Sequence, residues 1–262
     1  MSMNNEFLEH KIFNELSDYI DFYDNLSSSV FSISNSGITG IIGNKDSVFF
    51  SSMQGTLDSI KIVLEKGRIN DGYTLLRKYR DSAILNIYQI LYKESVQTFE
   101  NFLVENLNKW VKGKERMPMY KEMMEEIRKS EKLLIINSLL EKDQRYKNIH
   151  IRCNDHTHYN MFYYMMINDN QIYDTNRIKF LNIFSNDLRD IFILHFAYMF
   201  TLNDFYMKSS DYTDYLDAGL TPIEGSQYYV ASFFQQMFDS VIKKYRNDIA
   251  EEIKNNTIMK LE

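Results

Sequence analysis

The sequence predicts an all-α helical bundle, and three features of the chain support that class. Only two prolines, Pro118 and Pro222, and nine glycines occur in 262 residues, so few positions break a helix. Hydrophobic residues make up 44% of the chain and aromatic residues 15%, which is enough apolar surface for a large core. Apolar residues also recur three and four positions apart, as they do along the buried face of a helix.

The apolar spacing predicts helices over eight segments in chain order: 6–25, 56–66, 72–93, 96–112 ending near Gly113, one or two helices within 119–142, 155–168, 177–207 and 227–255. Residues 26–52 are rich in Ser, Gly and Asn, so we expect a loop or irregular segment there. Residues 209–226 are expected to form a turn-rich connection. Gly67 is expected to end the second helix, and Asn70 or Asp71 to cap the third.

The cellular compartment is predicted from what the chain lacks. Its single cysteine, Cys153, has no partner for an internal disulfide, which fits a reducing cytosol. The N-terminus is polar and has no apolar core of a secretory signal. The apolar run at residues 191–200 is interrupted by His195 and is well short of the ~20 residues that cross a bilayer. We therefore expect a soluble, cytoplasmic protein with no membrane partner.

Charge limits how the chain meets nucleic acid. The formal net charge is −6 and the sequence pI is about 5.5, so no global basic field attracts a polyanion. Residues 109–152 contain twelve Lys or Arg and seven Asp or Glu, a local balance of +5 that leaves −11 for the rest. A solvated helical face is the simpler interpretation of this segment. Trp110 lies in it and could stack on a base, although a lone tryptophan in an amphipathic helix is more often core.

Several signatures of common enzymes are absent from the sequence. There is no GxGxxG, Walker loop, HExxH helix, CxxC pair or GxSxG elbow, so dinucleotide enzymes, P-loop ATPases and common hydrolases are unsupported. Asp211, Asp214, Asp217 and Glu224 lack the spacing of a calcium loop and are expected to cap helices and form turns. We expect neither a metal nor a cofactor.

The densest polar constellation is residues 152–160, RCNDHTHYN. If Asn154 or Asp155 caps a new helix, His158 lies in its first turn and Arg152 approaches from the preceding segment. A helix N-terminus binds phosphate, an arginine holds phosphate oxygens, and a histidine moves a proton near neutral pH. These parts fit metal-independent RNA cleavage, in which the 2′-hydroxyl attacks the adjacent phosphate. His158 is then the base or acid and Arg152 stabilises the developing charge.

This spacing resembles the motif of the HEPN superfamily: Arg152, five intervening residues, then His158 followed by Tyr159 and Asn160. Residues 60–81 also resemble helical pairs of HEPN-like proteins. The resemblance covers roughly residues 56–168 and implies a HEPN-like helical core there. An N-terminal helix and irregular segment then occupy residues 1–55, and residues 169–262 add C-terminal helices that pack on the same core.

The resemblance also implies a function and partners. Members are helical, often dimeric, and many are ribonucleases of toxin–antitoxin, abortive-infection and other anti-phage systems. It implies RNA as substrate, a homodimer, and an antitoxin or another regulatory protein as a candidate partner. Many members have Asn, Asp or His directly after the arginine, whereas this chain has Cys153, so either the supporting residue is shifted to Asn154 or Asp155 or the site is inactive.

Alternatives remain for the individual residues. His156 competes with His158, because Arg152 and His156 share a helix face at i and i+4, but the family's interval favours His158. Capping alone also explains polar residues at a helix start. Arg77 and Asp81 lie one turn apart on the helix expected over 72–93.

In a HEPN-like bundle the helix over 72–93 could face the motif, with Arg77 adding positive charge and Asp81 orienting a histidine or Arg152. An ordinary ion pair is the simpler interpretation of those two residues. Two other functions stay open for the whole chain. One is a non-catalytic interaction module with an aromatic-rich surface, and the other is an enzyme that uses the Arg/His pair on a nucleotide or another phosphorylated small molecule.

Overall fold

A computed structural model of the chain describes residues 5–35, 40–96, 109–110, 112–169 and 176–262. Over these ranges the backbone is predominantly helical and contains no β-strand, only isolated bridges at Lys208–Val230 and Tyr229–Lys260. The all-α prediction is therefore confirmed. Among the helices that the structure describes, none combines the length and apolar composition needed to cross a bilayer.

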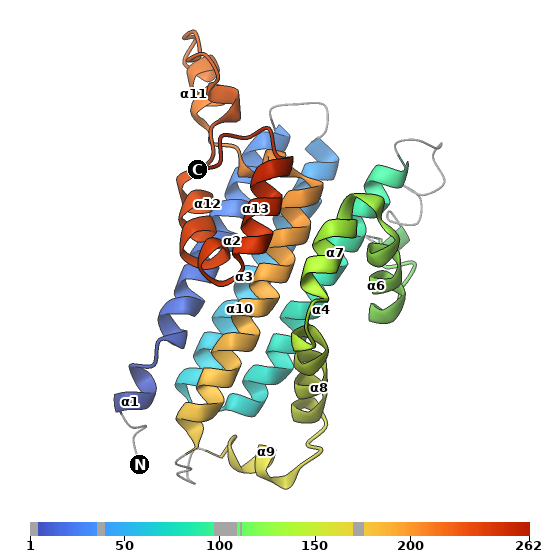
Figure 1. Cartoon of the computed structure of the whole chain (residues 1–262), viewed down its shortest axis with the longest axis vertical. Helices are drawn as coiled ribbons and strands as arrows, with labels where there is room; N and C mark the ends of the chain where they lie inside the picture. The colour runs from blue at the N-terminus through green and yellow to red at the C-terminus, as the bar shows by residue number, and fades with distance from the viewer. Residues whose placement is uncertain (1–4, 36–39, 97–108, 111, 170–175) are drawn as a thin grey trace.

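Four long helices form the body of the bundle and run side by side along its length (Figure 1): α2 (Ile12–Asn35), α3 (Gly40–Glu65), α4 (Ile69–Val96) and α10 (Arg177–Leu202). Shorter helices surround them: α1 (Asn5–Leu8), α6 (Tyr120–Lys129), α7 (Leu134–Leu140), α8 (Arg145–Thr157), α9 (Phe162–Met166), α11 (Asp211–Asp217), α12 (Ser232–Met237) and α13 (Asn247–Asn256). Helix α11 projects from one end of the bundle, and α8 with α9 lies towards the other end (Figure 1).

The expectation of a loop over residues 26–52 is wrong for the part that the structure describes, and residues 36–39 lie outside it. Helix α2 continues to Asn35 and α3 begins at Gly40, so the helix expected over 56–66 is the second half of α3. The two helices pack along each other and bury Leu26, Val30, Phe50 and Met53. Burial of these apolar side chains outweighs the weak helix propensity of the intervening Ser and Gly residues.

The expected boundaries around α4 are right at one end and wrong at the other. Gly67 ends α3 with a left-handed φ of 74°, and its N–H donates to the carbonyl of Leu64 at 2.7 Å. Helix α4 already begins at Ile69, so Asn70 and Asp71 lie in its first turn and do not cap it. Both side chains instead contact other elements, Asn70 through His156 and Asp71 through Asn168.

The remaining boundaries differ in detail. Residues 119–142 form α6 and α7, as expected, and Gly113 ends the preceding turn with a φ of 68°. Most of the helix expected over 96–112 lies outside the described residues. Residues 209–226 contain α11, whereas the helix expected over 227–255 is divided into α12, a π-turn at Phe238–Lys243 and α13. Arg246 interrupts that helix, because its φ of −146° and ψ of 66° are not helical.

Helix α10 is the central element of the core. Almost every side chain from Phe184 to Leu202 is buried, and the rings of Phe192, Phe196 and Phe200 pack against rings of α2 and α12. A polar network lies within this apolar interior. The Tyr23 hydroxyl is 2.7 Å from His195 Nδ1, and His195 Nε2 is 3.0 Å from Asn86 Oδ1. Burial lowers the pKa of His195 to about 3, so this imidazole is neutral at pH 7.

Candidate functional site

The motif around Arg152 lies on one continuous helix. Helix α8 passes through Asn154 and Asp155 without a break and ends at Thr157, so the new helix expected at residue 154 or 155, continuing over 155–168, is wrong. The apolar positions Ile149 and Cys153 and the ring of His156 are all buried and continue one helical face across the expected break. His158 is therefore at the C-terminal end of a helix, where the dipole is negative and carbonyls rather than N–H groups are free.

The end of α8 is a tight backbone reversal. The N–H of His158 donates to the carbonyl of Asn154 at 3.0 Å, and the N–H of Asn160 donates to the carbonyl of Asp155 at 3.0 Å. Between them, Tyr159 adopts a left-handed φ of 50°, which costs an L-residue about 1–2 kcal/mol. The amide of Asn160 also donates to the carboxylate of Asp155 at 2.6 Å and closes the reversal. With the bond from the Tyr159 N–H to the carbonyl of His156, this is a Schellman motif, a common helix ending in which Tyr159 takes the place usually held by glycine.

The imidazole of His158 is exposed on this reversal. It forms no hydrogen bond, ion pair or ring contact with the residues that the structure describes. An exposed imidazole is free to accept or donate a proton on a bound ligand. Of the two histidines considered for catalysis, His158 is the one that a substrate can reach.

His156 is part of the core. It stacks on Tyr73 with ring centroids 3.9 Å apart and lies 4.1 Å from Tyr164. Its Nδ1 is 2.9 Å from Asn70 Oδ1. Burial lowers its pKa to about 4, so the ring is neutral at pH 7. Its neighbour Cys153 is also buried, and burial raises the pKa of that thiol to about 12.

Arg152 is held by an acidic residue that the sequence did not single out. Its Nε donates to Asp187 Oδ2 at 2.7 Å and its Nη2 donates to Oδ1 of the same carboxylate. The hydroxyl of Tyr73 donates to Asp187 Oδ2 at 3.1 Å. Burial raises the pKa of Asp187, and the guanidinium and the Tyr73 hydroxyl limit that rise. The only signal in the sequence was a carboxylate, Asp187 or Asp190, within the apolar stretch of α10.

The two groups proposed for catalysis do not converge within one chain. Six residues on a continuous helix separate Arg152 and His158 by about 240° around the axis and about 9 Å along it. Arg152 faces α10, whereas His158 faces solvent, and no contact joins them in the described part of the chain. Arg152 binds Asp187 through Nε and Nη2, so its Nη1 group is left to contact a ligand. The exposed fraction of the Arg152 side chain is 33%.

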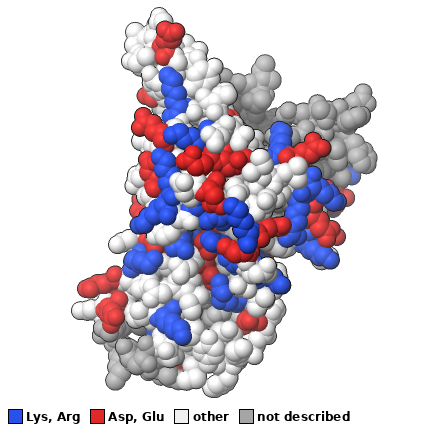
Figure 2. All heavy atoms as spheres, viewed as in Figure 1, with Lys and Arg blue, Asp and Glu red and all other residues white. Residues whose placement is uncertain are grey.

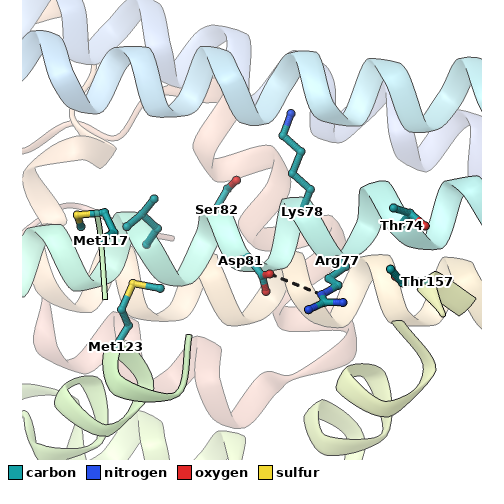
Figure 3. A pocket seen from close by; sticks show the side chains of 9 residues that line it. Thr74, Arg77, Lys78, Asp81, Ser82, Met117, Met123 and Thr157 are labelled. Atoms are coloured by element: carbon teal, nitrogen blue, oxygen red, sulfur yellow. Dashed lines mark ion pairs between the residues drawn. The ribbon is translucent and has the colours of Figure 1, made fainter. Parts of the chain in front are cut away.

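The other predicted residues are carried by two helices that pack against each other, Arg77 and Asp81 by α4 and Asn154 and Asp155 by α8. Asp81 Oδ1 accepts hydrogen bonds from Arg80 Nε at 3.0 Å and Nη2 at 2.7 Å. Arg77 Nε is 3.9 Å from Asp81 Oδ2, which is too long for a hydrogen bond. Asp81 thus pairs closely with Arg80 and forms a longer i,i+4 ion pair with Arg77 (Figure 3), and no hydrogen bond or ion pair joins it to Arg152 or a histidine in the described part of the chain. On α8, the Asn154 amide is 3.0 Å from His150 Nε2.

A pocket of about 450 Å³ lies on the outer face of α4 (Figure 3). Arg77 and Asp81 point to one side of α4 in this view, and Lys78 and Ser82 point to the other. Thr157, the residue before His158, is among the lining residues: Thr74, Arg77, Lys78, Asp81, Ser82, Leu85, Met117, Met123 and Thr157. The pocket therefore reaches the end of α8.

The basic segment does not form an open positive field. Figure 2 shows Lys and Arg interspersed with Asp and Glu over the face in view. Several of its cations are paired: Arg128 with Glu141 at 2.8 Å, Lys129 with Glu126 at 2.7 Å, and Arg145 with Asp143 at 2.8 Å. Trp110 stacks on Phe49 with centroids 5.9 Å apart. This segment is better described as a solvated helical face with internal ion pairs.

An exposed apolar cluster borders the candidate site. We call it the α9 patch and define it as Tyr159, Met161, Phe162 and Met165, exposed apolar residues that follow closely on one another from the end of α8 into α9. Phe162 is 76% exposed. Contiguous apolar side chains on a surface mark interaction sites more often than single exposed ones do.

The acidic connection forms local contacts. Asp211 accepts a hydrogen bond from the Ser209 hydroxyl at 2.6 Å, and Asp214 from the Ser210 hydroxyl at 2.7 Å. Over the described ranges, no group of three or more His, Cys, Asp or Glu side chains is placed to hold a metal ion. Comparison of the chain with protein-family models, with curated proteins and with solved structures found no significant match.

Proposed function

We propose that the chain is a metal-independent endoribonuclease of HEPN type that acts as a homodimer. The observation that carries the proposal is the exposed imidazole of His158 on a strained reversal, one residue from a pocket lined by Arg77 and Lys78. This arrangement puts a group that moves protons beside groups that attract phosphate.

The chemistry follows from these groups alone. His158 accepts the proton of a 2′-hydroxyl, the oxygen attacks the adjacent phosphorus, and the bond to the 5′-oxygen of the next nucleotide breaks. The leaving oxygen takes up a proton, and the products are a 2′,3′-cyclic phosphate and a 5′-hydroxyl. The Nη1 edge of Arg152, held in place by Asp187, stabilises the negative charge on the pentavalent phosphorus.

The divergence of Arg152 and His158 is the reason for proposing a dimer. Within one chain the two side chains point about 120° apart by the shorter way round α8, so they do not clamp one phosphate. A second copy that docks on the α9 patch brings its own α8 end to the same place. Arg152 of one copy then meets the imidazole of the other, and the exposed apolar surface becomes the buried centre of the interface.

The direct test is cleavage of single-stranded RNA by the purified protein in excess EDTA. We expect cleavage by the wild type and a loss of at least about a hundredfold in His158→Ala, as for removal of a general base. His10→Ala is the control, because it removes an imidazole from another element, the segment between α1 and α2, and a thermal melt accounts for the loss of its hydrogen bonds to Asn182 and the Ile12 N–H. Equal activity of His158→Ala and the wild type contradicts the assignment. A toxin or anti-phage role predicts in addition that expression of the wild type, and not of His158→Ala, arrests growth unless an antitoxin is co-expressed.

The α9 patch also favours a second function, a non-catalytic module that binds a protein through this apolar surface. That function predicts no RNA cleavage under any condition and no dependence on His158. It also predicts that a partner protein, rather than a second copy, covers Phe162.

A further inference from the structure

The pocket on α4 has two chemically different ends. In Figure 3, Met117 and Met123 lie at one end, Thr74 and Thr157 at the other, and Arg77 with Asp81 between them. Met123 is buried, so the first end has an apolar floor. A ligand that fills the pocket therefore has an apolar part and a polar part.

The polar part carries excess positive charge. Arg80, which is buried, holds Asp81 through both Nε and Nη2, so the Asp81 charge is already neutralised. Arg77 lies beyond hydrogen-bond distance of Asp81, and Lys78 is exposed and forms no ion pair with the described residues. The lining itself holds two cations, Arg77 and Lys78, and one carboxylate, Asp81, a balance of +1, and Arg80 adds a third cation bonded to Asp81. Burial, and then the charge of Arg80, lower the pKa of the neighbouring His150, whereas Asp81 raises it and Arg77 lowers it again.

We propose that this pocket binds one nucleoside monophosphate unit of single-stranded RNA. The phosphate lies against Arg77, Lys78 adds positive charge from the other side of α4, and the base lies against Leu85, Met117 and Met123. Bases of single-stranded RNA are free to leave their neighbours and pack on apolar side chains. The volume of about 450 Å³ is in the usual range for sites that take a small organic molecule.

This inference rests on the proposed ribonuclease function and gives its active site a second contact with substrate. Thr157 lines the pocket and precedes His158, so a nucleotide in the pocket is adjacent to the bond that His158 acts on. The strand then runs from the α8 end along the outer face of α4. The pocket is thus a subsite for a neighbouring nucleotide and not the place of the reaction.

The test measures binding without cleavage. A fluorescein-labelled single-stranded oligouridylate of about ten nucleotides is titrated with full-length His158→Ala protein, and fluorescence anisotropy measures binding. Uridine 3′-monophosphate and inorganic phosphate are then added as unlabelled competitors. Arg77→Met keeps most of the side-chain volume and removes the charge, and Thr74→Glu adds a negative charge at an exposed lining position. We expect each to weaken binding roughly tenfold and Arg77→Met to reduce the salt dependence by about one phosphate contact.

Two matched variants control for charge alone. Arg68→Met removes a guanidinium from the exposed turn before α4, about 13 Å along the axis from Arg77, which exceeds the Debye length of about 8 Å at physiological salt. Thr221→Glu adds the same charge at an exposed position outside the pocket. Both are expected to bind like the parent protein. Circular dichroism melts of all variants confirm that differences in binding do not come from unfolding.

The outcomes separate the two proposals. Tight oligouridylate binding that Arg77→Met and Thr74→Glu weaken supports the subsite, even if the wild type cleaves nothing and the ribonuclease proposal fails. Competition by uridine 3′-monophosphate at a concentration comparable to that of the oligonucleotide identifies a free nucleotide as the ligand source. Binding that is absent, equally weak in the controls, or displaced by inorganic phosphate as well as by the nucleotide overturns the inference.

Discussion

Arg152 and Asp187 join α8 to the central helix α10 through two hydrogen bonds to one carboxylate. Asp187 is only 3% exposed, so its charge depends on this guanidinium and on the hydroxyl of Tyr73. The pair fixes the side of α8 that faces the core and therefore the direction in which His158 leaves the helix. Arg152 therefore contributes both to the stability of the fold and to the proposed catalysis.

Removal of either partner is expected to destabilise the fold. Arg152→Ala leaves a buried carboxylate without its cation, which typically costs about 3–5 kcal/mol of unfolding free energy, and Asp187→Asn costs a similar amount. Asp239→Asn is the control, because Asp239 pairs with Lys243 at 2.7 Å on the surface. We expect that exposed pair to contribute no more than about 0.5 kcal/mol. Urea unfolding of the three variants measures the difference, and equal losses would show that the buried pair has no special role.

Mixed dimers test whether the reaction centre is shared between copies. We expect Arg152→Ala and His158→Ala, each inactive alone, to recover roughly a quarter of wild-type activity when they are unfolded and refolded together. Random pairing makes about half of the dimers mixed, and each mixed dimer carries one intact Arg152–His158 combination. Differently tagged subunits verify that mixed dimers form. Mixed dimers without any recovered activity would contradict a shared centre.

The α9 patch predicts the oligomeric state. Phe162→Glu places a charge at its most exposed ring and is expected to weaken self-association by at least about thirtyfold, as for loss of a hot-spot side chain. Leu220→Glu makes a comparable change at an exposed apolar residue beside α11 and is expected to leave the dimer unchanged. Light scattering coupled to size-exclusion chromatography reports the mass. A wild type that is monomeric at all concentrations refutes the dimer and leaves the patch for another protein.

Acid is expected to weaken the fold through two buried histidines. The folded-state pKa values, about 4 for His156 and about 3 for His195, are below the ordinary value of 6.5. Between the folded-state pKa of each histidine and its ordinary value of 6.5, the unfolded chain therefore binds more protons than the folded chain. The stabilisation is complete above about pH 6.5 and is lost as pH falls, by up to about 1.4 kcal/mol per pH unit for each histidine.

Burial raises the pKa values of Asp187 and Asp190, which offsets part of this loss at the acidic end. Urea unfolding at a series of pH values from 7.5 to 4.5 gives the slope of the unfolding free energy against pH. The non-titrating His156→Asn is expected to show a shallower slope than the wild type, and identical slopes would show that His156 is charged in the folded state.

Two glycines in helices are expected to respond differently to the same change. A Cβ at Gly55 would meet nothing within 4 Å, so Gly55→Ala should stabilise the protein by about 1 kcal/mol through helix propensity. A Cβ at Gly72 would lie 2.9 Å from Leu64 Cδ2 and 3.2 Å from Phe184 Cε2. Gly72→Ala should not show this stabilisation, because the added methyl group would press on Leu64 and Phe184, which are both buried and have little room to move. Thermal melts compare the two variants.

The helical class follows from local sequence, whereas the site depends on contacts between distant segments. Apolar spacing predicted α4 and α10 because each buries a stripe of its own residues. It failed at residues 26–52, where Ser27 donates its hydroxyl to the carbonyl of Ser47 across the α2–α3 contact. Composition is a local property and does not reveal that these polar side chains find partners on another helix.

The error in the motif has a similar origin. Asn154 and Asp155 are good capping residues, but buried Cys153 and His156 continue the helix through them. Tyr73, Asp187 and Arg152 are distant in sequence and meet only in the folded bundle, so no spacing rule predicted their network. The exposure of His158 likewise depends on where α8 ends.

The single thiol of the chain has a practical consequence. Cys153 is buried, and a raised pKa keeps it protonated, so reagents that attack thiolates will not modify the native protein. A cysteine introduced at exposed Asn160 would then be the sole attachment point for a spectroscopic label. Spin labels placed there on two copies would measure directly how far apart the α8 ends lie in solution.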